Sequence, residues 1–212
     1  MGIQIGKKTE IDETVIIRGD TTIGSNNKIG PYVVIGTGPQ HAAYDKPNGR
    51  IIIGDNNIMR DYSSVHGPTG KLTKIGSGCY IMAYSHIGHD CIVQDNVIIS
   101  TRVTLGGHVS IHRHANIGQG ATIHPYCRIG SYAMIGMGCP IVKDVPPFAL
   151  INRGIFTKIN RIGLERAGVS SEDIQGIHDA YSGGFEYKND VWYENEIKLF
   201  LSESKKYYRP DV

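Results

Sequence analysis

An aliphatic side chain recurs at every sixth position along most of this chain. The residues of the pattern are Ile5, Ile11, Ile17, Ile23, Ile29, Ile35, Ile53, Met59, Val65, Ile75, Ile81, Ile87, Val93, Ile99, Leu105, Ile111, Ile117, Ile123, Ile129, Ile135 and Ile141. Neither the helical period of 3.6 nor the two-residue alternation of an ordinary strand produces such spacing. It is typical of a parallel β-helix built from hexapeptide repeats, in which every short strand adds one side chain to a central stack. The sequence therefore predicts an all-β solenoid.

Three hexads make one triangular coil of 18 residues, and the pattern predicts about seven coils within residues 1–147. Two insertions interrupt it, at residues 37–52 and 66–74, and insertions in a solenoid often gather on a binding face. Residues 148–212 carry helical patterning instead, with a first helix expected to begin after Ser170. We therefore expect a β-helix followed by a short, mostly helical C-terminal extension.

The bulk composition narrows the class of protein. A formal net charge of +2 and the lack of a long run of Lys or Arg argue against nucleic-acid binding. No segment approaches the roughly 18 apolar residues of a membrane span, and the N-terminus has no signal-sequence pattern. We expect a soluble, cytoplasmic protein without membrane insertion.

The four cysteines fall into the same slot of the repeat. Cys79, Cys91, Cys127 and Cys139 each stand four residues after an aliphatic position, where other hexads mostly carry Val, Ala, Ser or Thr. A small residue there fills space around the central stack, and a free cysteine behaves as a small hydrophobic residue in such a place. We expect inert core thiols rather than disulfides or a metal site.

Several of the nine histidines share vertical columns of the expected prism. Residues 18 apart in an uninterrupted region lie one strand spacing apart, so His89 is expected beneath Gly107 and Asp90 beneath His108. In the neighbouring column, a pair of glycines leads up to His124. Imidazoles beside glycines predict a shallow groove with exposed backbone.

This groove has the groups that acyl transfer from a thioester requires. The imidazole of His89 could take the proton of an attacking hydroxyl or amine, and the backbone N–H of Gly107 could stabilise the oxyanion. The carboxylate of Asp90 could fix the tautomer of the imidazole. Neighbouring residues on a regular strand point in opposite directions, so Asp90 reaches His89 only if the pair lies near a corner.

The histidines allow two other interpretations. Neutral imidazoles clustered with Asp are ligands that zinc accepts. The histidines could also be polar surface residues without a chemical role, which is what we expect of four of them: His41, His112, His114 and His178.

The segment AYSHIGHDC at residues 83–91 resembles the catalytic stretch of the UDP-N-acetylglucosamine O-acyltransferases that begin lipid A biosynthesis. The resemblance covers nearly the whole chain, and its G-G-H and D-V-P-P motifs are more specific than the hexapeptide pattern. The other matching segments are residues 105–109, 123–127, 143–147 and 160–168.

The resemblance implies a homotrimer of left-handed β-helices with active sites between subunits and no bound cofactor. Acyl carrier protein would bring the acyl group as co-substrate, and a nucleotide sugar would accept it. The general base of the family falls on His89 and its oxyanion donor on the N–H of Gly107. Substrate contacts fall on His66, His86, His108 and His124, and a phosphate contact falls on Arg166.

This chain departs from the family where the acceptor sugar binds. Gln40 is kept, but His41 stands where the family has Asp, and Ala43 stands where it has Lys. Pro125 and Ile162 replace a Gln and a Glu. Because missing hydrogen-bond partners discriminate strongly between substrates, we expect a UDP-amino sugar, acylated on a hydroxyl or an amine, that differs from UDP-N-acetylglucosamine or binds differently.

Met137 lies at the position that sets the length of the acyl groove in the family. A methionine would block the far end of the groove, so we predict a short or medium acyl chain, such as a 3-hydroxyacyl group. The same side chain could instead fill the core.

Three rival functions follow from the same residues. The first is an acetyltransferase that acylates the nitrogen or oxygen of a nucleotide sugar from acetyl-CoA or another short acyl-CoA. The second is a zinc carbonic anhydrase of the hexapeptide type, and the third is a non-catalytic scaffold with an altered acceptor loop.

Overall fold

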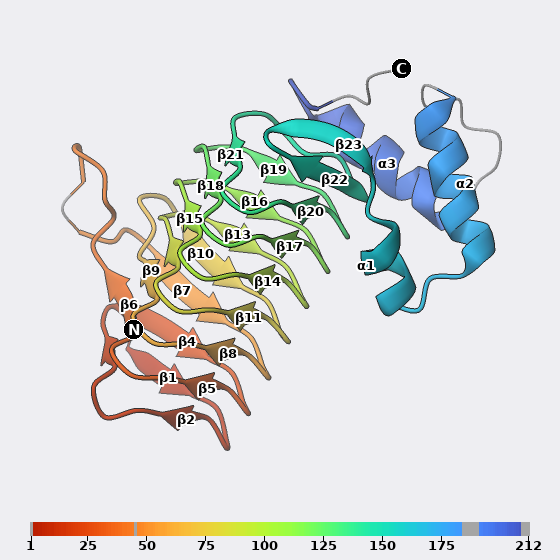
Figure 1. The fold of residues 1–212 in the computed structure, drawn as a ribbon. Coiled ribbons are helices and arrows are strands. Elements are labelled where there is room, and N and C mark those ends of the chain that lie inside the picture. Colours follow the sequence, from red (N-terminus) through yellow and green to blue (C-terminus); the bar gives the residue numbers. More distant parts are fainter. Residues whose placement is uncertain (1, 45, 184–190, 209–212) are drawn as a thin grey trace.

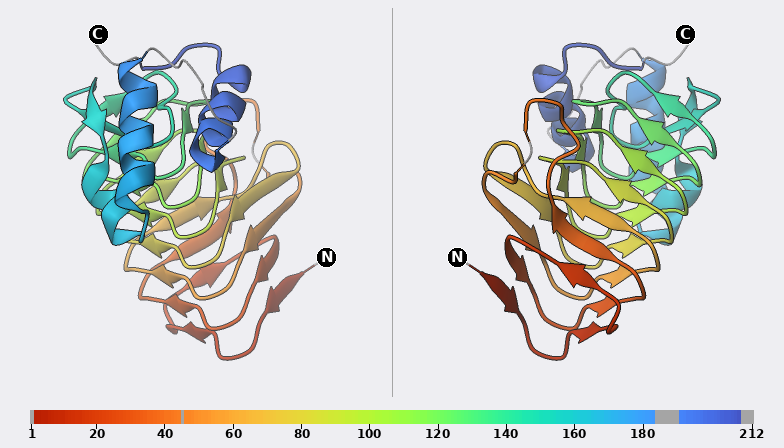
Figure 2. Two further views of the ribbon diagram at one scale, coloured as in Figure 1. Left: turned by 90° about the vertical axis from the view of Figure 1, so that its right-hand side faces the viewer. Right: turned by 90° about the vertical axis from the view of Figure 1, so that its left-hand side faces the viewer.

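Figure 1 shows the computed structural model, which describes residues 2–44, 46–183 and 191–208. The chain forms a three-sided prism of short strands, and its helices gather at the C-terminal end (Figures 1 and 2). After three sides the chain lies one strand spacing above its earlier course. The predicted left-handed parallel β-helix is confirmed.

Three sheets form the sides of the prism, with seven strands in sheet A, nine in sheet B and seven in sheet C. Sheet A contains β1 (Ile3–Ile5), β4 (Asp20–Ile23), β7 (Arg50–Ile53), β10 (Leu72–Ile75), β13 (Ile92–Val93), β16 (Ser110–Ile111) and β19 (Arg128–Ile129). Sheet B contains β2 (Glu10–Ile11), β5 (Lys28–Ile29), β8 (Ile58–Met59), β11 (Tyr80–Ile81), β14 (Ile98–Ile99), β17 (Asn116–Ile117), β20 (Met134–Ile135), β22 (Ala149–Asn152) and β23 (Ile155–Ile159). Sheet C contains β3 (Ile16–Ile17), β6 (Val34–Thr37), β9 (Ser64–His66), β12 (His86–Ile87), β15 (Thr104–Leu105), β18 (Thr122–Ile123) and β21 (Pro140–Ile141).

The predicted seven coils and the central aliphatic stack are present. Each step of 18 residues places one aliphatic residue in register with the next, as in the pairs Ile81 and Ile99 or Ile87 and Leu105. From Ile23 upward these side chains are at most 3% exposed. Each buried side chain of this size contributes about 1.5–3 kcal/mol, so the stack is the main source of stability of the prism.

The cysteines are free and buried, as the repeat predicts. Burial raises the pKa of the Cys79 thiol to about 11 and that of Cys91 to about 12. A thiol with so high a pKa carries almost no reactive thiolate at neutral pH. The expectation that the four cysteines fill the core is confirmed.

Both insertions are shorter than the sequence suggested, because strands extend into them. The loops cover residues 38–49 and 67–71, whereas residues 50–52 and 72–74 belong to β7 and β10. These two strands pair over four residues, from Arg50 opposite Leu72 onward. Stacked insertions of this kind extend the hydrogen-bonded ladder beyond the hexad.

One strand more than expected continues the prism beyond residue 147. Strand β22 pairs in parallel with β20, and Ile151 takes its place next to Ile135 in the stack. Only 16 residues separate this pair, so the period of 18 breaks, and the sequence pattern did not reveal the strand. Strand β23 then returns antiparallel to β22, which gives the C-terminal extension strands as well as helices.

The described helices are α1 (Arg161–Arg166), α2 (Ser171–Ser182) and α3 (Trp192–Glu203). The expected N-cap is confirmed, because the Ser170 side chain accepts from the Asp173 N–H. Helix α3 lies against sheet A, where the Arg128 guanidinium contacts the Glu203 carboxylate at 2.6 Å and covers the Phe200 ring. Within the described residues, no helix has the length and apolar character needed to cross a membrane.

Candidate active site

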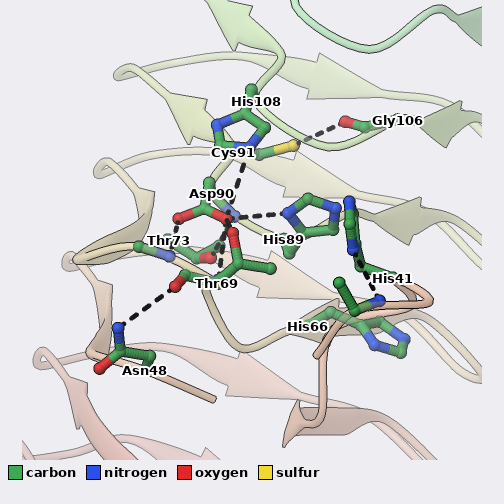
Figure 3. A network of polar contacts seen from close by, with 12 residues as sticks. His41, Asn48, His66, Thr69, Thr73, His89, Asp90, Cys91, Gly106 and His108 are labelled. Carbon is green, nitrogen blue, oxygen red and sulfur yellow. Dashed lines mark hydrogen bonds and ion pairs between the residues drawn. The ribbon is translucent and has the colours of Figure 1, made fainter. Parts of the chain in front are cut away.

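The corner between sheet C and sheet A brings the predicted catalytic residues together. Asp90, His108 and Tyr126 occupy equivalent places in three successive coils, with positive φ angles of 58, 62 and 66°. This left-handed backbone turns the chain sharply between neighbouring residues. Figure 3 shows the consequence, since the side chains of His89 and Asp90 lie on the same side of the chain. The corner that the sequence analysis required is present.

His89 and Asp90 form a hydrogen-bonded pair at the bottom of this corner. The His89 side chain is 10% exposed, and its Nδ1 lies 2.8 Å from the Asp90 carboxylate. Since a carboxylate can only accept here, Nδ1 carries the proton and Nε2 keeps its lone pair. The pair is therefore arranged as a general base and the group that orients it.

The second insertion loop holds the Asp90 carboxylate in place. Thr69 donates to it with both its N–H and its hydroxyl at 2.8 Å, and the Gly70 N–H donates at 2.9 Å. Burial raises the pKa of this carboxyl, but the hydrogen bonds from His89, Thr69 and Gly70 together outweigh it and hold the pKa below its ordinary value. Asp90 is thus ionised at neutral pH. Sequence analysis missed Thr69 and Gly70, although the position of the insertion beside the histidine column was a signal.

Gly107 lies directly against the His89 ring. A Cβ atom added at Gly107 would be 2.4 Å from both Cε1 and Nε2 of that ring, so a larger residue fits only if the ring moves. The Gly107 N–H donates to no acceptor among the residues that the structure describes. A free backbone donor therefore stands beside the nitrogen that keeps its lone pair.

These groups open into a pocket of about 440 Å³. Six residues that the sequence analysis selected line it: Gln40, His66, His86, His89, Gly107 and His108. Asp90 stands behind the ring of His89. The remaining lining residues are His41, Gly88, Thr104, Leu105, Gly106, Pro125 and Tyr126.

The sequence analysis expected His41 to be a surface residue without a chemical role, and its side chain is exposed. The first insertion loop carries it into the pocket, where its ring stands edge-on to that of His89 at 5.6 Å between centroids (Figure 3). The ring of His108 also stands edge-on to that of His89, with 5.2 Å between the ring centroids. Tyr126 was also missed, and it stacks on His108 with the rings 4.5 Å apart. Its place 18 residues after His108 was the available signal.

The two deeper histidines of the pocket are fixed by neighbouring groups. His66 Nδ1 donates to the Gly38 carbonyl at 2.7 Å, so its Nε2 keeps the lone pair. His86 lies 3.0 Å from the Ser64 hydroxyl through Nδ1. Burial, together with the charges of His66 and His89 when protonated, lowers the pKa of His86 to about 4. His86 is therefore neutral at physiological pH.

Three predicted site residues lie outside this pocket. His124 is exposed, and its Nδ1 lies 3.0 Å from the neighbouring Pro125 carbonyl. Arg166 lines a second groove of about 420 Å³ on the face of sheet B, beside His114 and Tyr132. Met137 is 76% exposed at the corner between β20 and β21, so the alternative that it fills the core is wrong.

The arrangement also bears on the zinc interpretation. Among the described residues, His89, Asp90 and His108 form a group with ligand atoms within 4.8 Å of one another. However, the two oxygens of Asp90 already accept four hydrogen bonds, and His89 uses its Nδ1 for one of them. A metal would have to displace these donors, so the donor set favours a hydrogen-bonded dyad.

Asp90→Asn is expected to lower kcat by about 30-fold while the fold stays intact, because a charge-assisted hydrogen bond contributes roughly 1.5–3 kcal/mol. The amide cannot stabilise the positive charge that His89 gains with a proton. Steady-state kinetics of the two proteins at neutral pH test this, and equal kcat values would contradict it.

The Asp90 carboxylate also affects stability. Since the pKa of Asp90 is lowered by folding, its stabilising effect is present at neutral pH and is lost as the pH falls through the pKa of Asp90 in the folded protein. The melting temperatures of the two proteins should therefore converge in acid.

Two families of known proteins match this chain, one along the β-helix and the other along the C-terminal extension. Residues 2–37 and 72–107 match the family described as bacterial transferase hexapeptide (six repeats). Residues 144–198 match the family described as UDP N-acetylglucosamine O-acyltransferase, domain 2. The first match lies on the coils and the second on the C-terminal extension.

Curated relatives and a solved structure agree with these matches. The acyl-[acyl-carrier-protein]–UDP-N-acetylglucosamine O-acyltransferases of Synechocystis sp. and Burkholderia orbicola are 35% and 37% identical to this chain, over 87% and 85% of its length and 67% and 70% of theirs. The UDP-N-acetylglucosamine acyltransferase structure of Francisella novicida superposes with a TM-score of 0.90 at 31% identity, over 99% of this chain and 84% of that one. This chain spans about two thirds of the length of the curated relatives that it matches.

Proposed function

The chain belongs to the UDP-N-acetylglucosamine O-acyltransferase family, and on that premise we propose that it moves a short or medium acyl group from acyl carrier protein to a UDP-amino sugar. The observation that carries the proposal is the dyad of His89 and Asp90 beside the free N–H of Gly107. The thioester of the carrier is the co-substrate, and the reaction needs no further cofactor.

In the proposed reaction, His89 Nε2 takes the proton of the acceptor hydroxyl as the oxygen attacks the thioester carbonyl. The carbonyl oxygen becomes an oxyanion, which the Gly107 N–H stabilises. Asp90 stabilises the imidazolium that forms. When the intermediate collapses, the C–S bond breaks, and the thiolate takes the proton from His89 and leaves as a thiol. The products are an ester and the free carrier, and His89 returns to its starting state.

The pocket favours a hydroxyl over an amine as the attacking group. Among the residues that the structure describes, none that lines the pocket is Asp, Glu, Lys or Arg, and Asp90 is occupied behind His89. An ammonium group would therefore lose its hydration in the pocket without gaining an opposite charge. A hydroxyl is neutral and can donate to the lone pairs on His89 and His66.

The same lack of charge supports a homotrimeric site. The diphosphate of a UDP-sugar requires cationic partners, and no Lys or Arg lines the catalytic pocket within the described part of the chain. Arg166 lies in the groove on sheet B, another side of the prism. Contact between sheet B of one copy and the catalytic pocket of the next would bring Arg166 to the phosphates and put the active site between subunits.

The cytoplasmic location of the protein stays a prediction.

Product analysis tests the proposal. The purified protein is incubated with a matrix of acyl thioesters, on acyl carrier protein and on coenzyme A, and with UDP- and dTDP-sugars, and the products are identified by mass spectrometry. We expect an acyl-UDP-sugar ester from the carrier-bound donor. Preference for acetyl-CoA would favour the rival acetyltransferase, and the lack of any acylated sugar would contradict the proposal.

Met137→Gly is expected to shift the preferred acyl chain to a longer one. The exposed methionine is proposed to close the far end of the acyl groove. Each methylene group of the acyl chain that becomes buried in the groove contributes about 0.8 kcal/mol to binding. For a chain longer by four carbons we expect kcat/KM to rise at least about 10-fold. The series of acyl-carrier donors measures this, and an unchanged preference would contradict the role of Met137.

A further inference from the structure

The second insertion loop, residues 67–71, reaches the Asp90 carboxylate with three hydrogen-bond donors. The N–H and the hydroxyl of Thr69 both donate to Oδ2 at 2.8 Å, and the Gly70 N–H donates to Oδ1 at 2.9 Å. The Nδ1–H of His89 donates to the same Oδ2 at 2.8 Å. Thr69 and the imidazole of His89 therefore share one carboxylate oxygen (Figure 3).

Thr69 has a fixed place in this loop. The Gly67 N–H donates to the Thr37 carbonyl at 2.9 Å, and Gly67 and Pro68 are both buried. A β-branched side chain such as that of Thr69 also has few rotamers. The hydroxyl is thus directed at Asp90 before any substrate binds, and such preorganised support is what a catalytic group needs.

The donors on Oδ2 compete for the charge of the carboxylate. Hydrogen bonds to the ionised form of a carboxyl group stabilise that charge. Because Thr69 supplies two of them, Asp90 stabilises the protonated imidazole of His89 less than an otherwise free carboxylate would. His108 is the second imidazole near this oxygen, with its Nε2 3.8 Å from Oδ2. The donors on Oδ2 therefore affect how readily His89 keeps a proton.

We propose that Thr69 is a positioning residue that sets the strength of the base, because its hydroxyl orients Asp90 toward His89 and limits the stabilisation of the protonated imidazole. This rests on the proposed function, in which His89 takes the proton of the acceptor. With the Thr69 hydroxyl in place, His89 stays unprotonated down to a lower pH than it would without it. Thr69 lies outside the described lining of the catalytic pocket, so it acts through Asp90.

Valine and serine at position 69 provide a matched pair of variants. Val keeps the shape of the side chain and the backbone N–H donor, while Ser keeps the hydroxyl. We expect Thr69→Val to move the acidic limb of the kcat/KM profile by about 0.5 pH unit to higher pH and to lower kcat about 10-fold. KM for the nucleotide sugar should stay within about 3-fold. Thr69→Ser should keep the limb in place and kcat within about 3-fold of the wild type.

A titration of His89 itself gives a measurement without turnover. Other titratable groups also lie around the dyad, namely His41, His66, His86, His108 and the exposed Lys71 of the loop. Histidine labelled with ¹³C at Cε1 allows each ring to be followed by NMR in the full chain, and the His89 signal is the one that His89→Ala lacks. The midpoint of this signal should lie about 0.5 pH unit higher in Thr69→Val and be unchanged in Thr69→Ser.

An Asp90→Ala background tests whether Thr69 acts through this carboxylate. With the acceptor gone, Thr69→Val should change neither the His89 titration nor kcat any further, because residues that act as a unit are not additive. An effect of the same size in both backgrounds would contradict the proposal. Equal His89 titrations in the wild type and in Thr69→Val would overturn the role of Thr69 and leave the acyltransferase proposal standing. The lack of any acylated product with the wild type would instead overturn the proposed function.

Discussion

His89→Ala is expected to lower kcat by about 1000-fold, within the roughly 100- to 10,000-fold contribution of a general base. The other imidazoles of the pocket cannot replace it. His86 lies three residues before it on β12, and His66 lies one coil below on β9. Of these imidazoles, only that of His89 has both a carboxylate on Nδ1 and a free amide beside Nε2. Binding of the nucleotide sugar should change little, because the lost interaction acts mainly in the transition state.

The measurement is steady-state turnover with the acyl-carrier donor identified by the product analysis. Thermal unfolding and sedimentation of the same preparation establish that the variant folds and assembles as the wild type does. His178→Ala is the matched control, since it removes an exposed imidazole on α2, outside the pocket. A folded His89→Ala protein that kept more than about a tenth of the turnover would contradict the assignment of the base.

The six-residue period was sufficient to predict the prism because every hexad buries one aliphatic side chain in the same central stack. A residue 18 positions later has the same environment, so the column from His89 to Gly107 could be predicted without coordinates. The same reasoning placed Asp90 beneath His108, and the backbone bond from the His108 N–H to the His89 carbonyl at 2.9 Å is consistent with this register. Local order of this kind is carried entirely by neighbouring coils.

The six-residue period does not predict the positions of residues in segments that lie outside the repeat. His41, Thr69 and Gly70 stand in the two insertions, where no column gives their position, yet they reach His89 or Asp90. Their places depend on how one loop packs on the other, which is a non-local property. Strand β22 was missed for a related reason, because its spacing from β20 is two residues shorter than a coil.

The left-handed backbone at Asp90 recurs at the same slot of other hexads, as at Tyr84, Asn96 and His108, but the spacing of the aliphatic residues does not by itself give this angle. A non-glycine residue at a φ of 58° is uncommon, and Asp is among the residues that tolerate it. The sequence raised the question of whether Asp90 could reach His89, and the left-handed corner answers it. A motif of His followed by Asp thus has a different meaning at a corner than on a strand.

Gly107→Ala is expected to lower kcat by at least about 100-fold, because a displacement of a reacting group by about 1 Å can cost that much. The backbone of Gly107 does not have a positive φ, so alanine is compatible with its conformation. The methyl group, however, would lie 2.4 Å from Cε1 and Nε2 of His89. The ring must therefore rotate away from the amide, and the base and the oxyanion donor no longer face the same carbonyl. Steady-state kinetics measure the loss, and a variant with wild-type kcat would show that the ring and the amide do not act together.

A double variant separates this mechanism from general damage to the corner. Overpacking of the His89 ring should make Gly107→Ala less stable by about 1–3 kcal/mol, as measured by denaturant unfolding. In the His89→Ala background the ring is gone, so the same methyl group should cost little stability. Mutations in direct contact are not additive, and here the direction of the coupling identifies the contact. If Gly107→Ala destabilised both backgrounds equally, its effect would come from the backbone of the corner, and the pairing of His89 with the Gly107 amide would lose its support.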